Sequence, residues 1–391
     1  MEKLYTNIVK GIFLDRPNRF ICHVQVNGEV CTCHMPNPGR MRELLFRGVT
    51  VYLTENRPGL RTSYRIIGIE KGNDGNIFFL DTAKANDVAA RLVMEHKIPG
   101  WESYSLLGRE ITMGDSRFDL LLGNRETGEV FPVEVKSCSL AGEKGAMFPD
   151  APTVRGKKHL DHLMSMSRNE EHAGLLILVY YSKAEWFLPD FHTDIEFAES
   201  FRQAMNLIDW KAAVISWSPE FTMPDSVRLI ESSERALDEE MGDRGNYLII
   251  FHMEEDKTVN QGNSGEVYYD KGYYVYVGHA DEHLDQKMKR WRTIHKQKKN
   301  TLDYLRAECA LTGIIPIRSK IDLTDPIVLR MAEISDWKVT HSSFQKDDNI
   351  TLFGFSENPM HIPEFLKIEE DFEINRLQSY FSNSNGISDK K

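Results

Sequence analysis

An aspartate, a glutamate and a lysine, Asp119, Glu134 and Lys136, are spaced in a way that could support hydrolysis of a phosphate ester. Asp119 lies in the apolar run 118–122, and Glu134 and Lys136 lie at the end of the next apolar run. Carboxylate oxygens bind hard cations such as Mg²⁺ or Mn²⁺, which can hold a phosphate and lower the pKa of a bound water. A lysine beside them can position or deprotonate that water. The three residues therefore predict a phosphodiester-hydrolysis site in which Asp119 and Glu134 bind the metal.

The segment between these residues predicts a β-hairpin that would bring them together. Residues 123–128 have the composition of a turn, and a hairpin symmetric about its centre sets Asp119 opposite Pro132. Because side chains alternate between faces with a period of two, Glu134 and Lys136 share a face with position 132, and Asp119 joins them. The alternative is a solvated strand face with Asp119 as a surface acid.

A basic segment follows the hairpin and could bind the phosphates of a substrate. Thr153 is a suitable N-cap, so we expect a helix to begin there. Its first turns would then carry four cationic side chains, which are Arg155, Lys157, Lys158 and His159. Cations are unfavourable at a helix N-terminus because of the helix dipole, so this arrangement favours a bound anion such as phosphate.

A rigid turn near the N-terminus is a second candidate for nucleic-acid contact. The turn, at residues 36–39, contains Asn37 and is followed by Arg40, Arg42 and Arg47. Arginine forks match phosphate oxygens, so the turn could bind the backbone of a nucleic acid. The alternative is a solvated surface turn.

A third basic element lies in the C-terminal part of the chain. Between Lys287 and Lys299 there are seven lysines and arginines and no acid, and Arg290 and Arg292 are among them. The interleaved aromatic side chains are Trp291 and His295. This pattern suits contact with a phosphate backbone and stacking with bases, and the alternative is a solvated helix face.

The elements that must position these residues change along the chain. Residues 1–82 alternate apolar runs with turn signals such as Asn27-Gly28, which predicts a small β-barrel. Residues 83–219 follow the order α, β-hairpin, α, β, α, β of an α/β domain. We expect an acidic linker helix over 220–244, a third α/β domain over 245–375, and a disordered tail over 376–391.

Length and composition limit the class of protein. The chain has 391 residues, 41% of them hydrophobic, so we expect several folded domains rather than one core. No apolar run approaches the length of a bilayer span, and five cysteines make no disulfide framework, so the sequence favours a cytoplasmic protein without a membrane partner. The formal charge of -11 means that nucleic-acid binding must depend on local basic patches. An oligomer is compatible with this composition.

Four segments, in family order, resemble the sugar fermentation stimulation protein A family. They are HMPNPGRMRELL at 34–45, SRFDLLL at 116–122, VEVKS at 133–137, and the run 148–160. The resemblance covers about residues 3–217. It implies an N-terminal OB-like barrel, a PD-(D/E)XK nuclease-like domain, DNA binding and divalent-metal-dependent nuclease activity.

The same resemblance implies roles for individual residues. Asp119 and Glu134 would bind Mg²⁺ or Mn²⁺, and Lys136 would be the catalytic lysine. Glu110, on the preceding strand, would be a fourth member of the site, and its alternative is a surface glutamate.

The C-terminal domain has a resemblance of its own. Gly245-Asn246-Tyr247 and Tyr276-Val277-Gly278 resemble the paired strand motifs of GIY-YIG nucleases, and residues 245–370 look like a related domain of unknown function that is fused to DNA-repair enzymes. In the related helix, Lys287 and Trp291 stand where arginine and histidine are normal. We therefore expect this domain to bind nucleic acid rather than to cut it.

Three functional hypotheses follow. The leading one is a DNA-binding protein, with RNA as a further possible ligand, that has a metal-dependent nuclease centre. The second is a non-catalytic DNA-binding or regulatory protein, related to sugar metabolism, that uses a nuclease-like scaffold. The third is an enzyme that acts on phosphorylated small molecules. Three domains that each carry a basic element favour a polymeric ligand over a small one.

Overall fold

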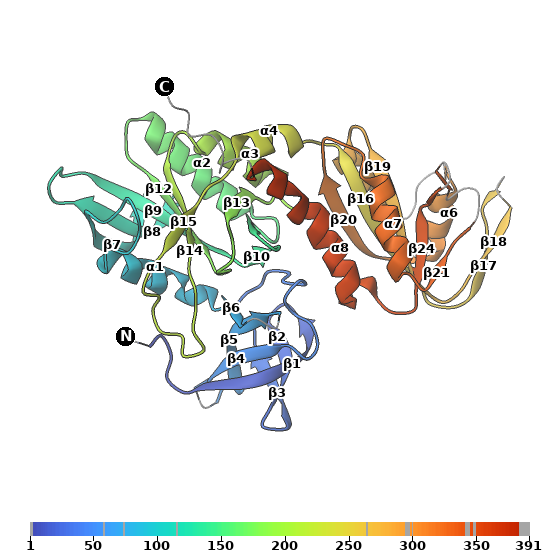
Figure 1. Cartoon of the computed structure of the whole chain (residues 1–391), viewed down its shortest axis with the longest axis horizontal. Helices are drawn as coiled ribbons and strands as arrows, with labels where there is room; N and C mark the ends of the chain where they lie inside the picture. The colour runs from blue at the N-terminus through green and yellow to red at the C-terminus, as the bar shows by residue number, and fades with distance from the viewer. Residues whose placement is uncertain are drawn as a thin grey trace. The chain divides into compact units, whose positions relative to one another are not determined.

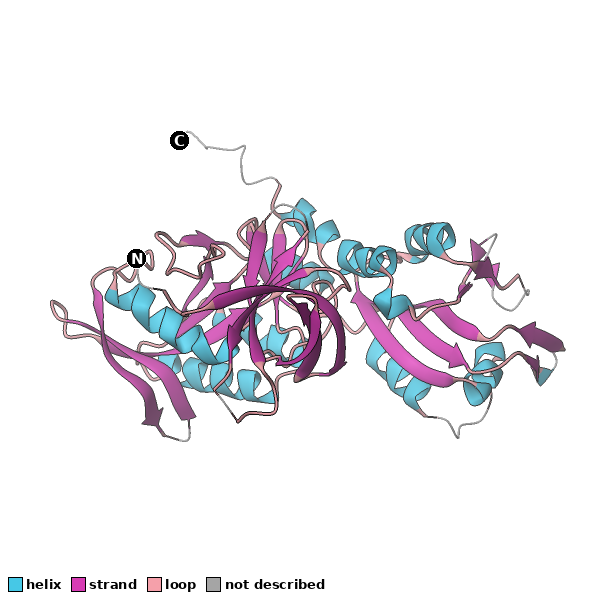
Figure 2. Cartoon of the chain, turned by 90° about the horizontal axis from the view of Figure 1, so that it is seen from below, coloured by secondary structure: helices cyan, strands magenta, loops and turns pink. Residues whose placement is uncertain are grey.

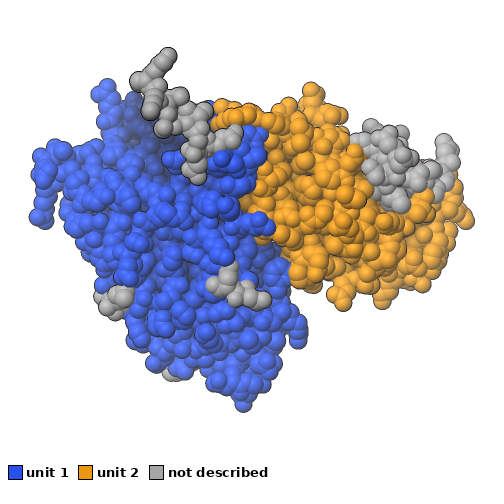
Figure 3. Space-filling view, in the orientation of Figure 1, with its two compact units in different colours: residues 1–234, 377–391 blue, residues 235–376 orange. Residues whose placement is uncertain are grey.

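The computed structural model describes residues 3–57, 59–72, 75–114, 116–262, 265–293, 298, 300–340, 345–346 and 349–382. The chain divides into two compact units (Figure 3). Unit 1 comprises Met1–Glu234 together with Leu377–Lys391, and unit 2 comprises Arg235–Arg376.

Unit 1 begins with a closed β-barrel, drawn in blue in Figure 1. Its strands are β1 (Ile8–Asn18), β2 (Ile21–Val26), β3 (Glu29–His34), β4 (Thr50–Glu55) and β5 (Tyr64–Lys71). They lie in the order β3-β2-β1-β4-β5, and a parallel pairing of β3 with β5 closes the ring. A further strand, β6 (Asn76–Phe79), pairs with β5. Asn27 and Gly28, at φ of 51° and 88°, make the turn between β2 and β3, as the sequence predicts. The barrel is therefore OB-like.

The rest of unit 1 is a mixed α/β domain built on a six-stranded sheet. The sheet order is β15-β14-β12-β9-β8-β7. The strands are β7 (Tyr104–Met113), β8 (Ser116–Asn124), β9 (Val130–Cys138), β12 (Gly174–Val179), β14 (Asp209–Val214) and β15 (Arg228–Ile230). Strand β12 pairs in parallel with β9 and with β14, whereas β7, β8 and β9 are antiparallel neighbours.

Helices and a small sheet complete this domain. A 3-10 turn, η1 (Thr82–Lys84), leads into α1 (Ala85–Met94), which packs against the sheet. Helix α2 (Val154–Arg168) packs against α3 (Ile195–Ala204). The small sheet has the order β10-β11-β13 and consists of β10 (Leu140–Ala141), β11 (Gly145–Phe148) and β13 (Trp186–Pro189).

Two segments differ from the sequence expectation. Residues 220–233 contribute to unit 1, because β15 extends the main sheet and the Phe221 side chain is fully buried. The helix expected in this region is α4 (Glu234–Glu240). The expected tail begins with η5 (Asn375–Tyr380), where Trp186 donates a 2.6 Å hydrogen bond from Nε1 to Gln378. Residues 383–391 lie outside the described residues.

Unit 2 is built on an antiparallel five-stranded sheet in the order β20-β16-β19-β24-β21. The strands are β16 (Gly245–Met253), β19 (Gly272–Ala280), β20 (Ala310–Arg318), β21 (Trp337–Lys338) and β24 (Leu352–Phe355). Two small hairpins complete the strands: β17 (Lys257–Asn260) pairs with β18 (Glu266–Tyr269), and β22 (Gln345–Lys346) pairs with β23 (Asn349–Ile350). The helical elements are α5 (Leu284–Arg292), α6 (Thr301–Glu308), α7 (Thr324–Ile334), η4 (Pro359–His361) and α8 (Pro363–Glu373). Helices lie on both sides of the sheet (Figure 2).

The two strand motifs of unit 2 lie side by side. Tyr247 of β16 pairs with Gly278 of β19, and a Cβ atom added to Gly278 would lie 2.3 Å from the Tyr247 ring. The glycine is therefore required for close packing of a buried tyrosine.

No helix among the described residues is long and apolar enough to cross a bilayer.

Candidate nuclease-like site

The β8–β9 hairpin brings Asp119 and Glu134 together, in a register different from the expected one. Leu120 pairs with Val133, so Asp119 lies across from Glu134 rather than from Pro132. The loop is centred later than expected, and the Asn124 N–H donates to the Glu129 carbonyl at 2.8 Å. The register shift is two residues, and an even shift leaves every side chain on its predicted face.

Glu134 is the most buried member of the cluster, with 3% of its surface exposed. Its Oε1 accepts hydrogen bonds from the Lys136 ammonium and from Nδ1 of His159, which is also buried. Its Oε2 is buried and has no hydrogen-bond partner within the described part of the chain. A buried carboxylate oxygen without a partner is unfavourable, so this atom is suited to accept a ligand.

Asp119 is held by two donors that fix the orientation of its carboxylate. The Val135 N–H donates to Oδ2 at 2.7 Å, and the Asn86 side chain, from α1, donates to Oδ1 at 2.7 Å. Burial, together with the nearby Glu134 carboxylate, raises the pKa of Asp119. A cation near both carboxylates would relieve this repulsion.

Two carboxylates limit the kind of metal that the cluster could hold. Across the residues that the structure describes, no group of three or more His, Cys, Asp and Glu side chains is placed to hold a metal ion. Mg²⁺ usually keeps several waters and binds proteins through one or two carboxylates. Asp119 and Glu134 fit such an ion, and the unpartnered Oε2 of Glu134 provides the oxygen.

The Glu110 carboxylate lies apart from this hydrogen-bonded cluster. Its neighbours Arg109 and Ile111 pair with Leu120 and Phe118, so Glu110 lies across from Asp119. However, its backbone has φ of 54°, and its carboxylate pairs with Arg117 with 53% of the side chain exposed.

Helix α2 begins as the sequence predicts, but its cationic side chains differ in exposure and in pairing. Thr153 accepts a 3.0 Å hydrogen bond from the Gly156 N–H and caps the helix. Arg155 and Lys158 are exposed. Lys157 pairs with Asp161 at 2.7 Å, which raises the pKa of Lys157.

His159 differs from its predicted place on the phosphate-binding surface. It is 6% exposed and faces Glu134, so its role is in the acidic cluster. The helical spacing of the sequence contains the signal for a buried His159. His159 lies three residues after Gly156 and four before Leu163, so it shares their face of the helix, and both are buried.

The turn at 36–40 is held by contacts within unit 1. Asn37 is buried and accepts the Gly39 N–H at 2.9 Å. Arg40 donates to the Asp150 carbonyl at 2.7 Å and to the Thr193 hydroxyl at 2.5 Å. The Asn37 amide also donates to the Ser139 hydroxyl at 3.3 Å, so Asn37 and Arg40 join the barrel to the α/β domain instead of pointing to solvent. Arg42 is partly exposed.

The basic stretch of unit 2 also contains both exposed side chains and side chains that are paired or buried. Lys287 and Arg292 are exposed, whereas Arg290 pairs with the buried Asp303. Trp291 is only 4% exposed and belongs to the hydrophobic core, so it is not available for base stacking as the sequence suggested. His295 lies outside the described residues.

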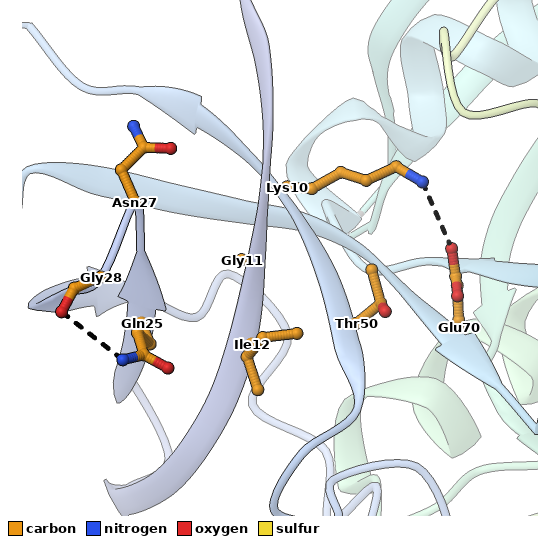
Figure 4. Close-up of a pocket in the computed structure, with 8 residues that line it drawn as sticks. All are labelled: Lys10, Gly11, Ile12, Gln25, Asn27, Gly28, Thr50 and Glu70. Carbon is orange, nitrogen blue, oxygen red and sulfur yellow. Dashed lines mark hydrogen bonds and ion pairs between the residues drawn. The ribbon is translucent and has the colours of Figure 1, made fainter.

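A shallow groove of about 400 Å³ lies on the barrel wall (Figure 4). It is lined by Lys10, Gly11, Ile12, Gln25, Asn27, Gly28, Thr50 and Glu70. Lys10 and Glu70 approach each other at 3.9 Å, so the charged groups that line the groove are balanced. The groove contains none of the residues predicted to bind nucleic acid.

Three family models match the chain in succession. Residues 14–78 match the SfsA N-terminal OB domain, and residues 83–220 match the Sugar fermentation stimulation protein RE domain. Residues 246–349 match a domain of unknown function, DUF123. The barrel and the α/β domain of unit 1 thus correspond to the first two models, and the unit 2 sheet begins within one residue of the third.

Relatives and a solved structure agree with this division. The chain is 38% identical over 203 residues to a sugar fermentation stimulation protein homologue of Clostridium botulinum. The aligned residues make up 52% of this chain and 87% of the relative. A homologue from Clostridium kluyveri is 38% identical over 201 residues, or 51% of this chain and 86% of the relative. The structure of Pyrococcus furiosus SfsA in complex with Ca²⁺ superposes with a TM-score of 0.51 and 26% identity, covering 60% of this chain and all of that one. The chain belongs to the sugar fermentation stimulation protein family.

Proposed function

We propose that the chain is a nucleic-acid-binding protein whose unit 1 hydrolyses phosphodiester bonds with a divalent metal ion. One observation carries the proposal: Asp119 and Glu134 face each other across the β8–β9 hairpin, and Glu134 Oε2 is buried without a hydrogen-bond partner among the described residues. The Ca²⁺ in the Pyrococcus furiosus relative supports a divalent ion. Mg²⁺ or Mn²⁺ would suit two carboxylates.

The residues around the carboxylates have separate tasks in this proposal. Asn86 and the Val135 N–H hold Asp119 in one orientation. His159 holds Glu134 through Oε1 and leaves Oε2 for the metal. A bound divalent ion would supply positive charge to the phosphate and lower the pKa of an attacking water. Lys136, beside Glu134, would orient that water or take its proton.

In this proposal, the exposed cations of α2 bind the substrate backbone. Arg155 lies on the same helix as His159 and donates to its Nε2 at 3.4 Å. Arg155 and Lys158 are therefore within two turns of the helical residue that touches the acidic cluster. We expect them to contribute to affinity for a polyanion more than to chemistry.

Unit 2 is proposed to bind nucleic acid and not to cut it. Lys287, Lys289 and Arg292 are its exposed cations on α5. The GIY-YIG resemblance rests on the neighbouring Tyr247 and Gly278, while Trp291, at a position where the related helix carries another side chain, is part of the core.

A non-catalytic scaffold is the second candidate. It is favoured by one observation, that Lys136 and His159 both bind Glu134 Oε1 and stabilise the carboxylate without a metal. In that case the acidic cluster would be a structural ion-pair network, and nucleic-acid binding would remain.

The test compares the full-length protein with Asp119→Asn and Glu134→Gln variants on labelled single- and double-stranded DNA and RNA. Reactions contain Mg²⁺, Mn²⁺ or chelator. We expect chelator to abolish cleavage and each substitution to reduce it by at least about 100-fold, with Mn²⁺ affinity lowered in calorimetry.

Glu185→Gln is the matched control, because Glu185 is an exposed unit 1 glutamate that pairs with Lys144. It should cleave like wild type. Glu110→Gln decides whether Glu110 belongs to the site. A wild-type protein that binds nucleic acid tightly but cuts none with any metal would establish the scaffold candidate.

A further inference from the structure

An exposed aromatic ring lies at the turn between β1 and β2 of the barrel. Phe20 has 48% of its surface exposed. The guanidinium carbon of Arg19 lies 5.4 Å from the centre of the Phe20 ring, so a cation covers part of the ring. The Asn18 side chain accepts the Phe20 N–H at 3.0 Å, which fixes the backbone of the turn.

A partly buried arginine, Arg16, holds this turn in place. Arg16 donates hydrogen bonds to the carbonyl of Arg19 at 2.8 Å and to those of Asn37, Gly39 and Arg40 at 2.8 to 3.0 Å. The Met35 N–H also donates to the Phe20 carbonyl at 2.8 Å. Because these bonds hold the backbone of the turn from both sides, less of the chain has to be ordered when a ligand binds, which lowers the entropy cost of binding.

The same contacts continue toward the acidic cluster. Arg40, whose carbonyl accepts from Arg16, donates to Thr193 and to the Asp150 carbonyl. Asp194, the next residue, accepts the N–H of Thr153, which caps α2. Helix α2 carries His159, the partner of Glu134. A chain of hydrogen-bonded residues within unit 1 thus joins the Phe20 turn to the candidate catalytic carboxylates.

We propose that Phe20 and Arg19 form a stacking platform for an unpaired base of single-stranded nucleic acid. An aromatic ring offers a face to any base, and Arg19 can contact the neighbouring phosphate. A base in a duplex is already stacked on its neighbours, so the platform favours single strands. This proposal rests on the nucleic-acid binding proposed above and is independent of hydrolysis.

The surroundings of Phe20 favour this ligand over an apolar protein partner. Pro17, Asn18 and Arg19, which precede it, are all exposed, and the two residues next to the ring in sequence are an amide and a cation. A protein-docking surface would be expected to present a contiguous apolar patch. The groove of Figure 4, by contrast, pairs its lysine with a glutamate and offers no excess positive charge.

The experiment measures binding of a fluorescent 20-nucleotide oligothymidylate and of a duplex of equal length by the full chain in chelator, so that cleavage cannot interfere. Phe20→Ala should weaken single-strand binding by roughly 5- to 150-fold and change duplex binding far less. Phe20→Trp should retain single-strand affinity. Val30→Ala is the matched control, since Val30 is an exposed apolar residue of the same barrel, with 64% of its surface exposed.

A second measurement reports the contact directly. An oligonucleotide that contains 5-iodouracil should cross-link on irradiation to the peptide that contains Phe20, as identified by mass spectrometry, and Arg19→Ala should reduce the yield. Unchanged single-strand affinity in folded Phe20→Ala, an equal loss for single strand and duplex, or wild type without single-strand affinity would each overturn the platform. Cleavage by wild type with Mg²⁺ or Mn²⁺ is scored separately, so failure of the hydrolysis proposal remains distinguishable.

Discussion

The first turns of α2 and the last turn of α5 both carry clustered cations, but their positions relative to the helix dipole are opposite. In α5 the last turn contains Lys289, Arg290 and Arg292, where the dipole stabilises positive charge. In α2 the cations follow the N-cap directly, and the first turn of this described helix contains no acidic residue. Positive charge there is unfavourable unless an anion is nearby.

Local partners increase this difference. Arg290 of α5 pairs with Asp303, whose side chain is fully buried, and Trp291 fills the core. Folding alone therefore accounts for Arg290 and Trp291, whereas the other cations in the last turn of α5 lie where the dipole already stabilises them. Arg155 and Lys158 of α2 are exposed and lie next to a helix face that contacts Glu134. The comparison shows that equal basic composition is stronger evidence for anion binding when the fold itself disfavours the charges.

The largest expected effect tests whether the cluster next to α2 is catalytic. Lys136→Met should lower kcat by roughly 10²- to 10⁴-fold, because a group that acts on the attacking water is lost. Mn²⁺ affinity and nucleic-acid affinity should stay within a few-fold of wild type. Lys144→Met is the control, since Lys144 is an exposed unit 1 lysine that pairs with Glu185 at 3.0 Å. Equal cleavage by folded Lys136→Met and wild type would remove the lysine from the chemistry.

An intermediate effect compares a buried aspartate in unit 1 with an exposed one in unit 2. Asp190 accepts the N–H groups of His192 and Thr193, and burial raises its pKa to about 6. Because the folded protein disfavours the charged form, stability falls as the pH rises from about 3.8 to about 6. Asp190→Asn should therefore be more stable than wild type at pH 7, by up to about 3 kcal/mol, and about as stable as wild type below pH 3.8.

Asp336 of unit 2 should behave in the opposite way. The Ser356 hydroxyl and N–H both donate to its carboxylate at 2.6 Å and lower the pKa of Asp336. Its stabilising contribution is present above the pKa of the unfolded chain and is lost as the pH falls through the lowered value. Asp336→Asn should thus be less stable than wild type at pH 7. Urea-induced unfolding at several pH values measures both variants, and a shared sign would contradict this assignment.

The pairing of Asp119 with Glu134 could be predicted from the sequence because it depends on parity. Side chains alternate along strands, so even a two-residue error in the register left both carboxylates on one face. The cap at Thr153 was equally local, since its acceptor and the Gly156 donor are three residues apart. Features that are determined by a short segment of chain can therefore be predicted from the sequence.

The roles of Arg40 and Phe20 could not be predicted in this way. Arg40 donates to a carbonyl 110 residues away, and nothing in the turn at 36–40 indicates that partner. The exposure of Phe20 depends on how β1 and β2 close the barrel, and an aromatic residue beside a strand is more often expected in a core. Whether a side chain faces solvent or a distant segment is decided by tertiary packing.

The smallest effect tests the dipole argument itself with the same substitution at both helices. Arg155→Gln removes a cation from the first turn of α2, and Arg292→Gln removes one from the last turn of α5; both side chains are exposed. In the free protein at low salt, Arg155→Gln should raise the free energy of unfolding by about 0.3 to 1 kcal/mol, and Arg292→Gln should lower it by a similar amount. Both changes should shrink in about 1 M salt, because ions screen exposed charges. With a single-stranded oligonucleotide bound, the sign for Arg155→Gln should reverse, since the lost cation then had a phosphate partner. If Arg155→Gln destabilises the free protein as Arg292→Gln does, the cations of α2 already have an anionic partner within the fold, and the case for a phosphate site at its N-terminus fails.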